Sequence, residues 1–365
     1  MFLAQQIVLA FSLLSSINAA RHKRSCKVSS SIEPSSTIDP NGLFASSLDD
    51  ATSLNRLAAV QSIAVTSAMS GSSTTIATST TTTASSSNTA SNEARAAGKA
   101  GIGWPAQEKD AAPVSQFFSP NSTVSWWFDW NKNWNQGVLT SDGVQVEGEF
   151  IPMIFGANYL NNSDTFQEGF TEVMGYNEPD HKSDTVSQYM EPSEAAEVWK
   201  TQIVQIHQQY PNVKIHSPVM ASNRQWLIDW FDAICPDNSA SDGWGDCEYK
   251  PDYVSAHMYN TNVEYFKNTL TSFQKDFGLP LILSEFACHE FSDNPPQPST
   301  NQVSAFMQET MEWLDQQEWV VKYAWFGVAR DLQWLFGVYE TNRLMDTAGT
   351  LTSLGRQYMN GGKKA

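Results

Sequence analysis

Two glutamates, Glu178 and Glu285, each follow a short apolar run in which a charged side chain has little structural use. An ionised carboxylate beside apolar residues loses hydration unless another group pairs with it. A glutamate after a strand is often a helix first-turn acid, but Glu178 precedes Pro179, which disfavours helical geometry. Glu285 lies within the largely apolar run Leu281–Ala287. We therefore predict that the two glutamates form a catalytic pair of carboxylates.

A carboxylate pair is what hydrolysis of a glycosidic bond requires. One carboxyl must be protonated to release the leaving oxygen, and the other must be ionised to attack the anomeric carbon. The sequence lacks the HExxH pattern of zinc peptidases and the GxSxG turn of serine hydrolases. Its cysteine and histidine spacings fit no zinc site. We predict no metal and no cofactor.

Eight short apolar runs supply the strands that would position these residues. They alternate with helical patterns and show no clean polar alternation, which is typical of a parallel sheet buried on both faces. The runs are Gly101–Trp104, Thr123–Phe128, Glu149–Phe155, Glu172–Tyr176, Val213–Ser217, Tyr253–His257, Leu281–Ser284 and Val320–Trp325.

Amphipathic stripes predict the helices between the later strands. Pro192 opens the first of them, and Gly278 with Pro280 ends the third, as helix start and stop signals do. The predicted helices are Ser193–Tyr210, Gln225–Ile234, Glu264–Phe277, Val303–Leu314 and Leu351–Tyr358.

The alternation predicts an α/β fold, either a doubly wound sheet or a closed barrel. We favour a single (β/α)8 TIM barrel over residues 99–362, because eight units fit that length and no complete glycine-rich phosphate loop follows the first strand. In such a barrel, side chains at the carboxyl ends of the strands form the active site. Glu178 would end the fourth strand and Glu285 the seventh.

The ordered set of motifs resembles glycoside hydrolase family 128 over about Lys99 to Asn360. Two of these motifs contain the glutamates, and the others flank them along the chain. They are Gly175–Asp180, Ser284–Cys288, Ser125–Asn131, Glu149–Met153, Ala256–Tyr259, Tyr323–Phe326 and Leu351–Gly355. Two features depart from the family pattern: Met258 replaces a usual aromatic, and the loop from Cys235 to Cys247 is longer.

The resemblance implies a retaining endo-β-1,3-glucanase that acts on a β-glucan polysaccharide. Glu178 would be the acid/base and Glu285 the nucleophile. Asn177 would bind the sugar 2-hydroxyl, a contact that strengthens in the transition state. His257 and Tyr259 would orient the nucleophile or contact sugar hydroxyls, although a lone histidine can also be a satisfied core residue.

Aromatic side chains would supply the apolar faces on which sugar rings stack. We expect Trp325 to form the floor of a subsite. Alternation along the second strand implies that at least one of Trp126, Trp127 and Trp130 belongs to the core, and we assign Trp127 to the substrate groove.

The first 98 residues predict export and no domain. Residues 1–20 have the apolar run and small residues of a signal peptide, and Lys23-Arg24 resembles a dibasic processing site. Residues 21–98 form a disordered propeptide or linker, since about 18 of the 26 residues from Thr66 to Ser91 are Ser or Thr. Sequons begin at Asn121 and Asn161. We expect a secreted protein, extracellular or associated with a cell wall.

Composition narrows the class of partner. The 365 residues carry a formal net charge of −17, which disfavours nucleic acid as a partner. Beyond the signal peptide, no run reaches the length of a membrane span. We expect a monomer that binds an uncharged polymer.

Three questions remain open from the sequence. A non-catalytic, wall-associated β-glucan-binding protein would have the same aromatic surplus, and the pair could serve another β-glucan linkage. Cys235 and Cys247 could close a loop as a disulfide, but Cys26 and Cys288 allow other pairings.

Overall fold

The computed structural model describes residues 98–364, except 109, 134–145, 160–165, 167–168, 183–186 and 293–294. The predicted signal peptide (residues 1–20), all but the last residue of the predicted linker (residues 21–98), Cys26 and the sequon at Asn161 lie outside the described residues.

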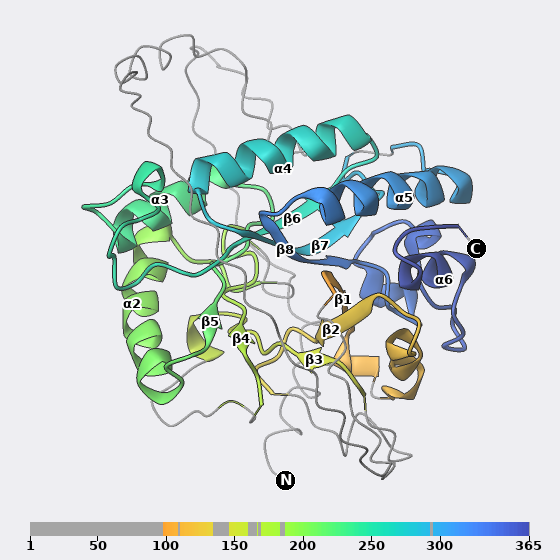
Figure 1. The fold of residues 1–365 in the computed structure, drawn as a ribbon, viewed down its shortest axis with the longest axis horizontal. Coiled ribbons are helices and arrows are strands. Elements are labelled where there is room, and N and C mark those ends of the chain that lie inside the picture. Colours follow the sequence, from red (N-terminus) through yellow and green to blue (C-terminus); the bar gives the residue numbers. More distant parts are fainter. Residues whose placement is uncertain are drawn as a thin grey trace, which may run out of the picture. The chain divides into compact units, whose positions relative to one another are not determined.

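Among the described residues, eight strands form two parallel sheets, and each strand lies within or beside a predicted run (Figure 1). The larger sheet has the order β3-β2-β1-β8-β7-β6, and β4 pairs with β5. Single parallel bridges, Met153 with Met174 and His216 with Tyr253, link the ends of the two sheets. The strands are β1 Ala100–Gly103, β2 Val124–Phe128, β3 Glu149–Phe150, β4 Glu172–Val173, β5 Lys214–Ile215, β6 Val254–Tyr259, β7 Leu281–Ala287 and β8 Val320–Trp325. The predicted α/β fold with a parallel sheet is confirmed.

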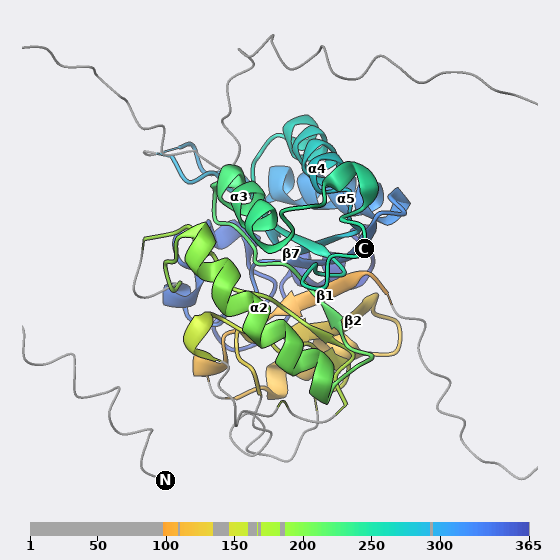
Figure 2. The same cartoon turned by 90° about the vertical axis from the view of Figure 1, so that its left-hand side faces the viewer.

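The part of the chain that the structure describes has five α-helices, all at predicted positions. Helices α4 and α5 lie side by side and pack on β6 and β8, while α2 packs on α3 (Figures 1 and 2). In the described parts of the chain, no helix is both long and apolar enough to cross a membrane. The helices are α2 Pro192–Gln209, α3 Arg224–Ile234, α4 Val263–Phe277, α5 Thr300–Gln316 and α6 Ser353–Met359.

Local chemistry sets the ends of α4. The side chain of Asn262 caps its first turn by accepting the Tyr265 N–H at 3.0 Å. Gly278 ends the helix with φ +63°, a left-handed conformation that glycine adopts without steric cost. Between these ends, the apolar stripe that predicted the helix is buried.

Short 3-10 turns complete the described connections. They are Ala106–Glu108, Ala112–Phe118, Ala157–Tyr159, Ala240–Asp242, Leu332–Leu335 and Glu340–Asn342.

Strands β6 and β7 are longer than predicted, which corrects the placement of two site residues. Their parallel pairing pairs His257 with Glu285 and Tyr259 with Ala287. Glu285 and Tyr259 therefore lie inside strands, where backbone hydrogen bonds fix them, rather than in loops past the strand ends.

The two faces of the sheet bury different sets of side chains. Trp126 and Phe128 of β2 pack with Ile151, Met153, Met174 and Ala324 in one small cluster, while Trp127 between them joins the larger core. This split follows from the two-residue period of a strand. A Cβ added at Gly103 would lie 2.9 Å from the Trp130 ring, so this glycine leaves room for that indole.

A buried charge cluster lies where β4 begins. Glu172 accepts a hydrogen bond from Lys322 of β8 at 2.7 Å and lies 2.9 Å from Nε2 of His216. All three residues are less than 10% exposed. Although burial opposes ionisation, the hydrogen bond and charge of His216, with the charge of Lys322, lower the pKa of Glu172 to about 2.

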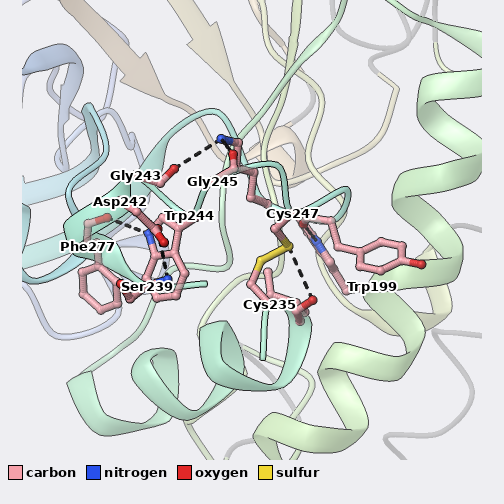
Figure 3. The surroundings of a disulfide bond; sticks show 12 residues. Trp199, Cys235, Ser239, Asp242, Gly243, Trp244, Gly245, Cys247 and Phe277 are labelled. Carbon is pink, nitrogen blue, oxygen red and sulfur yellow. Dashed lines mark hydrogen bonds between the residues drawn. A yellow bond between two sulfur atoms is a disulfide. The ribbon is translucent and has the colours of Figure 1, made fainter. Parts of the chain in front are cut away.

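The structure pairs Cys235 with Cys247, whose Cα atoms are 5.6 Å apart (Figure 3). The loop between them packs onto α4, because Trp244 donates its indole N–H to the Phe277 carbonyl at 2.8 Å. Cys288 is buried and free. The disulfide therefore closes the long loop that departs from the family pattern.

Candidate active site

Four of the predicted residues meet beside the carboxyl ends of three strands. Glu178 follows β4, His257 and Tyr259 belong to β6, and Glu285 belongs to β7. One carboxylate oxygen of each glutamate and one nitrogen of His257 lie within 4.8 Å of one another. The parallel topology therefore joins groups that are 107 residues apart in the chain.

The backbone around Glu178 is held in an unusual conformation. Glu178 has φ +47°, in the left-handed region that costs a non-glycine residue about 1–2 kcal/mol. Its N–H donates to the Val219 carbonyl at 2.8 Å. Two residues on, the carboxylate of Asp180 accepts backbone N–H groups of Ala221, Ser222 and Asn223 at 2.7–3.0 Å. These bonds attach the segment that carries Glu178 to the loop that follows β5.

Glu285 accepts hydrogen bonds on both of its oxygens. The Tyr259 hydroxyl donates to Oε2 at 2.6 Å, and the Trp130 indole N–H donates to Oε1 at 3.0 Å. Nε2 of His257 lies 3.4 Å from Oε1. Donors of this kind favour the ionised carboxylate, which is the form that a nucleophile needs.

Burial nevertheless dominates the titration of Glu285, whose residue is 6% exposed. Burial raises its pKa, and the charge of Glu178 raises it further. The charge of His257 and the hydrogen bonds from Tyr259 and Trp130 oppose this rise. A carboxyl with a raised pKa and two dedicated donors is typical of an active site rather than of a structural ion pair.

His257 bridges the two glutamates. Its Nδ1 lies 2.8 Å from Oε1 of Glu178, while its Nε2 faces Glu285. Burial favours the neutral ring, but the charges of Glu285 and Glu178 and the hydrogen bond to Glu178 raise the pKa of His257 above its ordinary value. The structure thus brings His257 together with both predicted glutamates.

The same three residues could offer ligands to a divalent cation. An imidazole binds a metal through one nitrogen, whereas both nitrogens of His257 here face a carboxylate oxygen. Nδ1 of His257 is hydrogen-bonded to Glu178, whereas Nε2, 3.4 Å from Glu285, has no hydrogen-bond partner among the described residues.

Asn177 lies beside this group. It is 5% exposed, and its N–H donates to the Phe155 carbonyl at 3.0 Å, which sets the chain direction just before Glu178. Its place next to the acid agrees with the position expected from the sequence.

The prediction that Trp127 and Trp325 form a sugar-binding surface is wrong. Both side chains are fully buried in the larger core. The Trp325 ring packs edge-on against Phe286 with its indole N–H donating to the Asn342 carbonyl, and Trp127 packs against Phe150. Each residue points away from the face that carries its neighbour Trp126 or Ala324, so neither ring can contact a ligand.

Trp130 is the site aromatic that the sequence did not assign. Its φ of +58° breaks the strand alternation, so the two-residue period cannot predict its direction. Its ring packs against Phe128 and Phe326 and lines a small, open pocket. Trp334 and Leu335 of the Leu332–Leu335 turn also line this pocket. The Asp-Trp-Asn sequence after β2, typical of a turn, was the available signal.

The family model described as the glycosyl hydrolase catalytic core matches residues 101–358. An exo-β-1,3-glucanase of glycoside hydrolase family 128, subgroup V, from Cryptococcus neoformans has 37% sequence identity. The match covers 73% of this chain and 99% of that enzyme, with a TM-score of 0.64. The chain belongs to glycoside hydrolase family 128.

Two other relatives of this family 128 protein differ in description. Alkali-sensitive linkage protein 1 of Schizosaccharomyces pombe is 26% identical over 268 residues, which are 72% of this chain and 45% of that protein. The chain therefore spans about half the length of that relative. A family 128 oligosaccharide-binding protein from Trichoderma gamsii has 20% identity and a TM-score of 0.55, with 73% of this chain and 93% of that one covered. At that identity the likeness shows the fold alone.

Proposed function

We propose that the protein is a retaining glycoside hydrolase that cleaves β-1,3-glucan, with Glu285 as nucleophile and Glu178 as acid/base. The observation that carries the proposal is the separation of the two carboxylates. Their nearest oxygens lie within 4.8 Å. Retaining enzymes hold the pair about 5–5.5 Å apart, whereas inverting enzymes need about 6.5–9.5 Å to admit a water molecule.

In the first step, an oxygen of Glu285 attacks the anomeric carbon while Glu178 gives its proton to the glycosidic oxygen. A covalent glycosyl-enzyme forms, and the shortened glucan leaves as an alcohol. Tyr259 and Trp130 hold the attacking carboxylate in place through their hydrogen bonds. Glu178 is the more exposed of the two side chains, at 18% against 8%, which suits a group that must reach the leaving oxygen.

In the second step, Glu178 takes a proton from water, the water oxygen attacks the anomeric carbon, and Glu285 leaves as a carboxylate. His257, hydrogen-bonded to Glu178, supports the change of that group from acid to base. We assign sugar binding to Asn177, which precedes the acid in the chain, and to the apolar surface of the pocket that Trp130 lines.

The relatives support β-1,3-glucan as the substrate. The C. neoformans protein is described as an exo-β-1,3-glucanase, and an enzyme of the same family from Sorangium cellulosum as an endo-β-1,3-glucanase. The sequence resemblance implied endo action, and product analysis separates the two: single glucose units indicate exo action, and a ladder of oligosaccharides indicates endo action.

The proposal also covers the closure of the sheet and the export of the protein. We infer that the eight parallel strands close into a (β/α)8 barrel, which the bridges between the two sheets support. The predicted signal peptide, residues 1–20, supports secretion to the cell exterior or wall.

The test is a pair of alanine variants assayed on laminari-oligosaccharides. Glu285→Ala should abolish hydrolysis, and added azide should then trap a glycosyl azide of the opposite anomer. Glu178→Ala with azide should give an azide of the same anomer as the substrate. Glu264→Ala, at an exposed position of α4, is the control that should retain full activity.

Full activity of Glu285→Ala would refute the assignment of the nucleophile, and an inverted first-formed product would refute the retaining mechanism. Tight binding of oligosaccharides by the wild-type chain without any turnover would instead favour the binding protein that the sequence left open. Cleavage of another linkage in a panel of β-glucans would overturn the choice of substrate.

A further inference from the structure

The turn that follows β2 is held by reciprocal bonds between Asp129 and Asn131. Oδ1 of Asp129 accepts the Asn131 N–H at 3.1 Å, and the Asn131 side-chain amide donates to the Asp129 carbonyl at 2.8 Å. The Asn131 carbonyl in turn accepts the Met153 N–H at 2.9 Å. The turn is thus closed internally and attached to the segment after β3.

Trp130 occupies the middle of this turn, in a conformation that its side chain does not favour. Its φ of +58° lies in the left-handed region, which is strained for a residue with a Cβ, so surrounding bonds must hold it there. The result is that the indole N–H reaches Glu285 at 3.0 Å while the ring packs 4.8 Å from that of Phe128.

Asp129 is unusually buried for a turn aspartate. It is 1% exposed, and its Oδ2 has no hydrogen-bond partner among the residues that the structure describes. Burial raises its pKa to about 7. Asp346, which makes the same kind of turn by accepting the N–H groups of Ala348 and Thr350, is exposed. Turn formation alone therefore does not require the burial seen at Asp129.

We propose that Asp129 is a positioning residue of the reaction: it closes the turn that holds Trp130 left-handed and so aims the indole N–H at the nucleophile Glu285. The inference rests on the proposed function, because it assigns a role to Asp129 through Glu285. Asp129 would be the third residue, after Tyr259 and Trp130, that supports the reacting carboxylate. It would do so without contacting the sugar or Glu285.

The test is a double-mutant cycle on Asp129 and Trp130, assayed as kcat and KM over pH. Asp129→Ala should lower kcat roughly tenfold to a hundredfold with little change in KM, as expected when a carboxylate loses a hydrogen bond of about 1.5–3 kcal/mol. Trp130→Phe keeps a ring but removes the donor, and should give a loss of the same size. The double variant should be no worse than either single variant, because both remove one interaction.

Two further readouts separate positioning from general damage. Asp129→Asn keeps an oxygen that can accept the Asn131 N–H, and should restore most of the activity. The acid limb of kcat/KM should move to higher pH in Asp129→Ala and Trp130→Phe, because the lost hydrogen bond favoured the ionised Glu285. The other titratable groups that face Glu285, which are Glu178, His257 and Tyr259, stay in place in both variants.

Asp346→Ala removes the comparable turn and should leave kcat and the pH profile unchanged. Additive losses in the double variant, or full activity of Asp129→Ala, would overturn the positioning role. If Glu285→Ala is itself active, the proposed function fails; if Glu285→Ala is inactive and the losses are additive, only the role of Asp129 fails.

Discussion

Tyr259 and Trp130 distinguish Glu285 from Glu178, because each donates a hydrogen bond to Glu285. Burial and the neighbouring carboxylate raise the pKa of Glu285 and so disfavour the ionised form that a nucleophile needs. The two hydrogen-bond donors lower this pKa and partly offset the rise. Glu178 instead meets the imidazole of His257. The environments of the two glutamates therefore differ in the way that the proposed roles of nucleophile and acid/base require.

Tyr259→Phe should lower kcat/KM on laminari-oligosaccharides about tenfold to a hundredfold, because the hydroxyl that donates to Oε2 is lost. The pKa of Glu285 should rise further, so the acid limb of the pH profile should move upward. Tyr265→Phe, at an exposed position of α4, is the matched control. An unchanged pH profile in Tyr259→Phe would contradict the role of this bond.

Chelation tests whether Glu178, His257 and Glu285 bind a metal ion. We expect dialysis against EDTA to leave kcat/KM unchanged, because both nitrogens of His257 already face carboxylates. A loss of activity that an added divalent cation restores would show that Glu178, His257 and Glu285 bind a metal instead.

At the scale of elements, strand pairing decides the site more than any single motif does. The pairing of β6 with β7 sets His257 opposite Glu285, and the turn after β2 brings Trp130 into contact with both hydrophobic clusters. Apolar runs and stop signals predicted the position of every strand and of the five helices. They could not predict how far β6 and β7 extend, because strand ends depend on the partner strand.

The loop from Cys235 to Cys247 is the element whose stability is most directly testable. The double variant Cys235→Ala/Cys247→Ala should lower the free energy of unfolding by about 3 kcal/mol. The disulfide joins residues with a sequence separation of 12, and a closed loop of that length restricts the unfolded chain by about this much. For a domain of this size, that corresponds to a fall in Tm of about 6–12 °C. Activity at 25 °C should persist, since the glutamates lie on other elements.

Calorimetry of both forms with and without a reductant provides the check. The reductant should lower the Tm of the wild type to that of the double variant and leave the variant unchanged. A wild type whose Tm does not respond to reduction would show that the bridge contributes little.

At the scale of the whole molecule, one buried charge cluster links the two sheets. Glu172, His216 and Lys322 lie where β4 begins, and Glu172 pairs with both of the other residues. The folded pKa of Glu172 is about 2, below its ordinary 4.5. Its contribution to stability is therefore complete above about pH 4.5 and is lost as the pH falls through 2.

Glu172→Gln should lower the free energy of unfolding at pH 7 by about 3–5 kcal/mol, because it leaves buried Lys322 without its closest carboxylate. It should also flatten the loss of stability between pH 4.5 and 2. Urea unfolding at pH 7 and pH 3 measures both effects, with Glu197→Gln in an exposed pair as the control. Equal loss of stability on acidification in wild type and variant would contradict this account.

The sequence by itself determined the order of strands and helices, the two glutamates and the companions His257 and Tyr259, because apolar runs, stop signals and short motifs are local. Only the tertiary structure decided which face each aromatic occupies. Trp127 and Trp325 point into the core. Trp130 has a left-handed backbone conformation that breaks the two-residue period of the strand, and its side chain reaches Glu285. That direction depends on a turn fixed by Asp129, Asn131 and Met153, which includes a contact from beyond β3 that no local pattern contains.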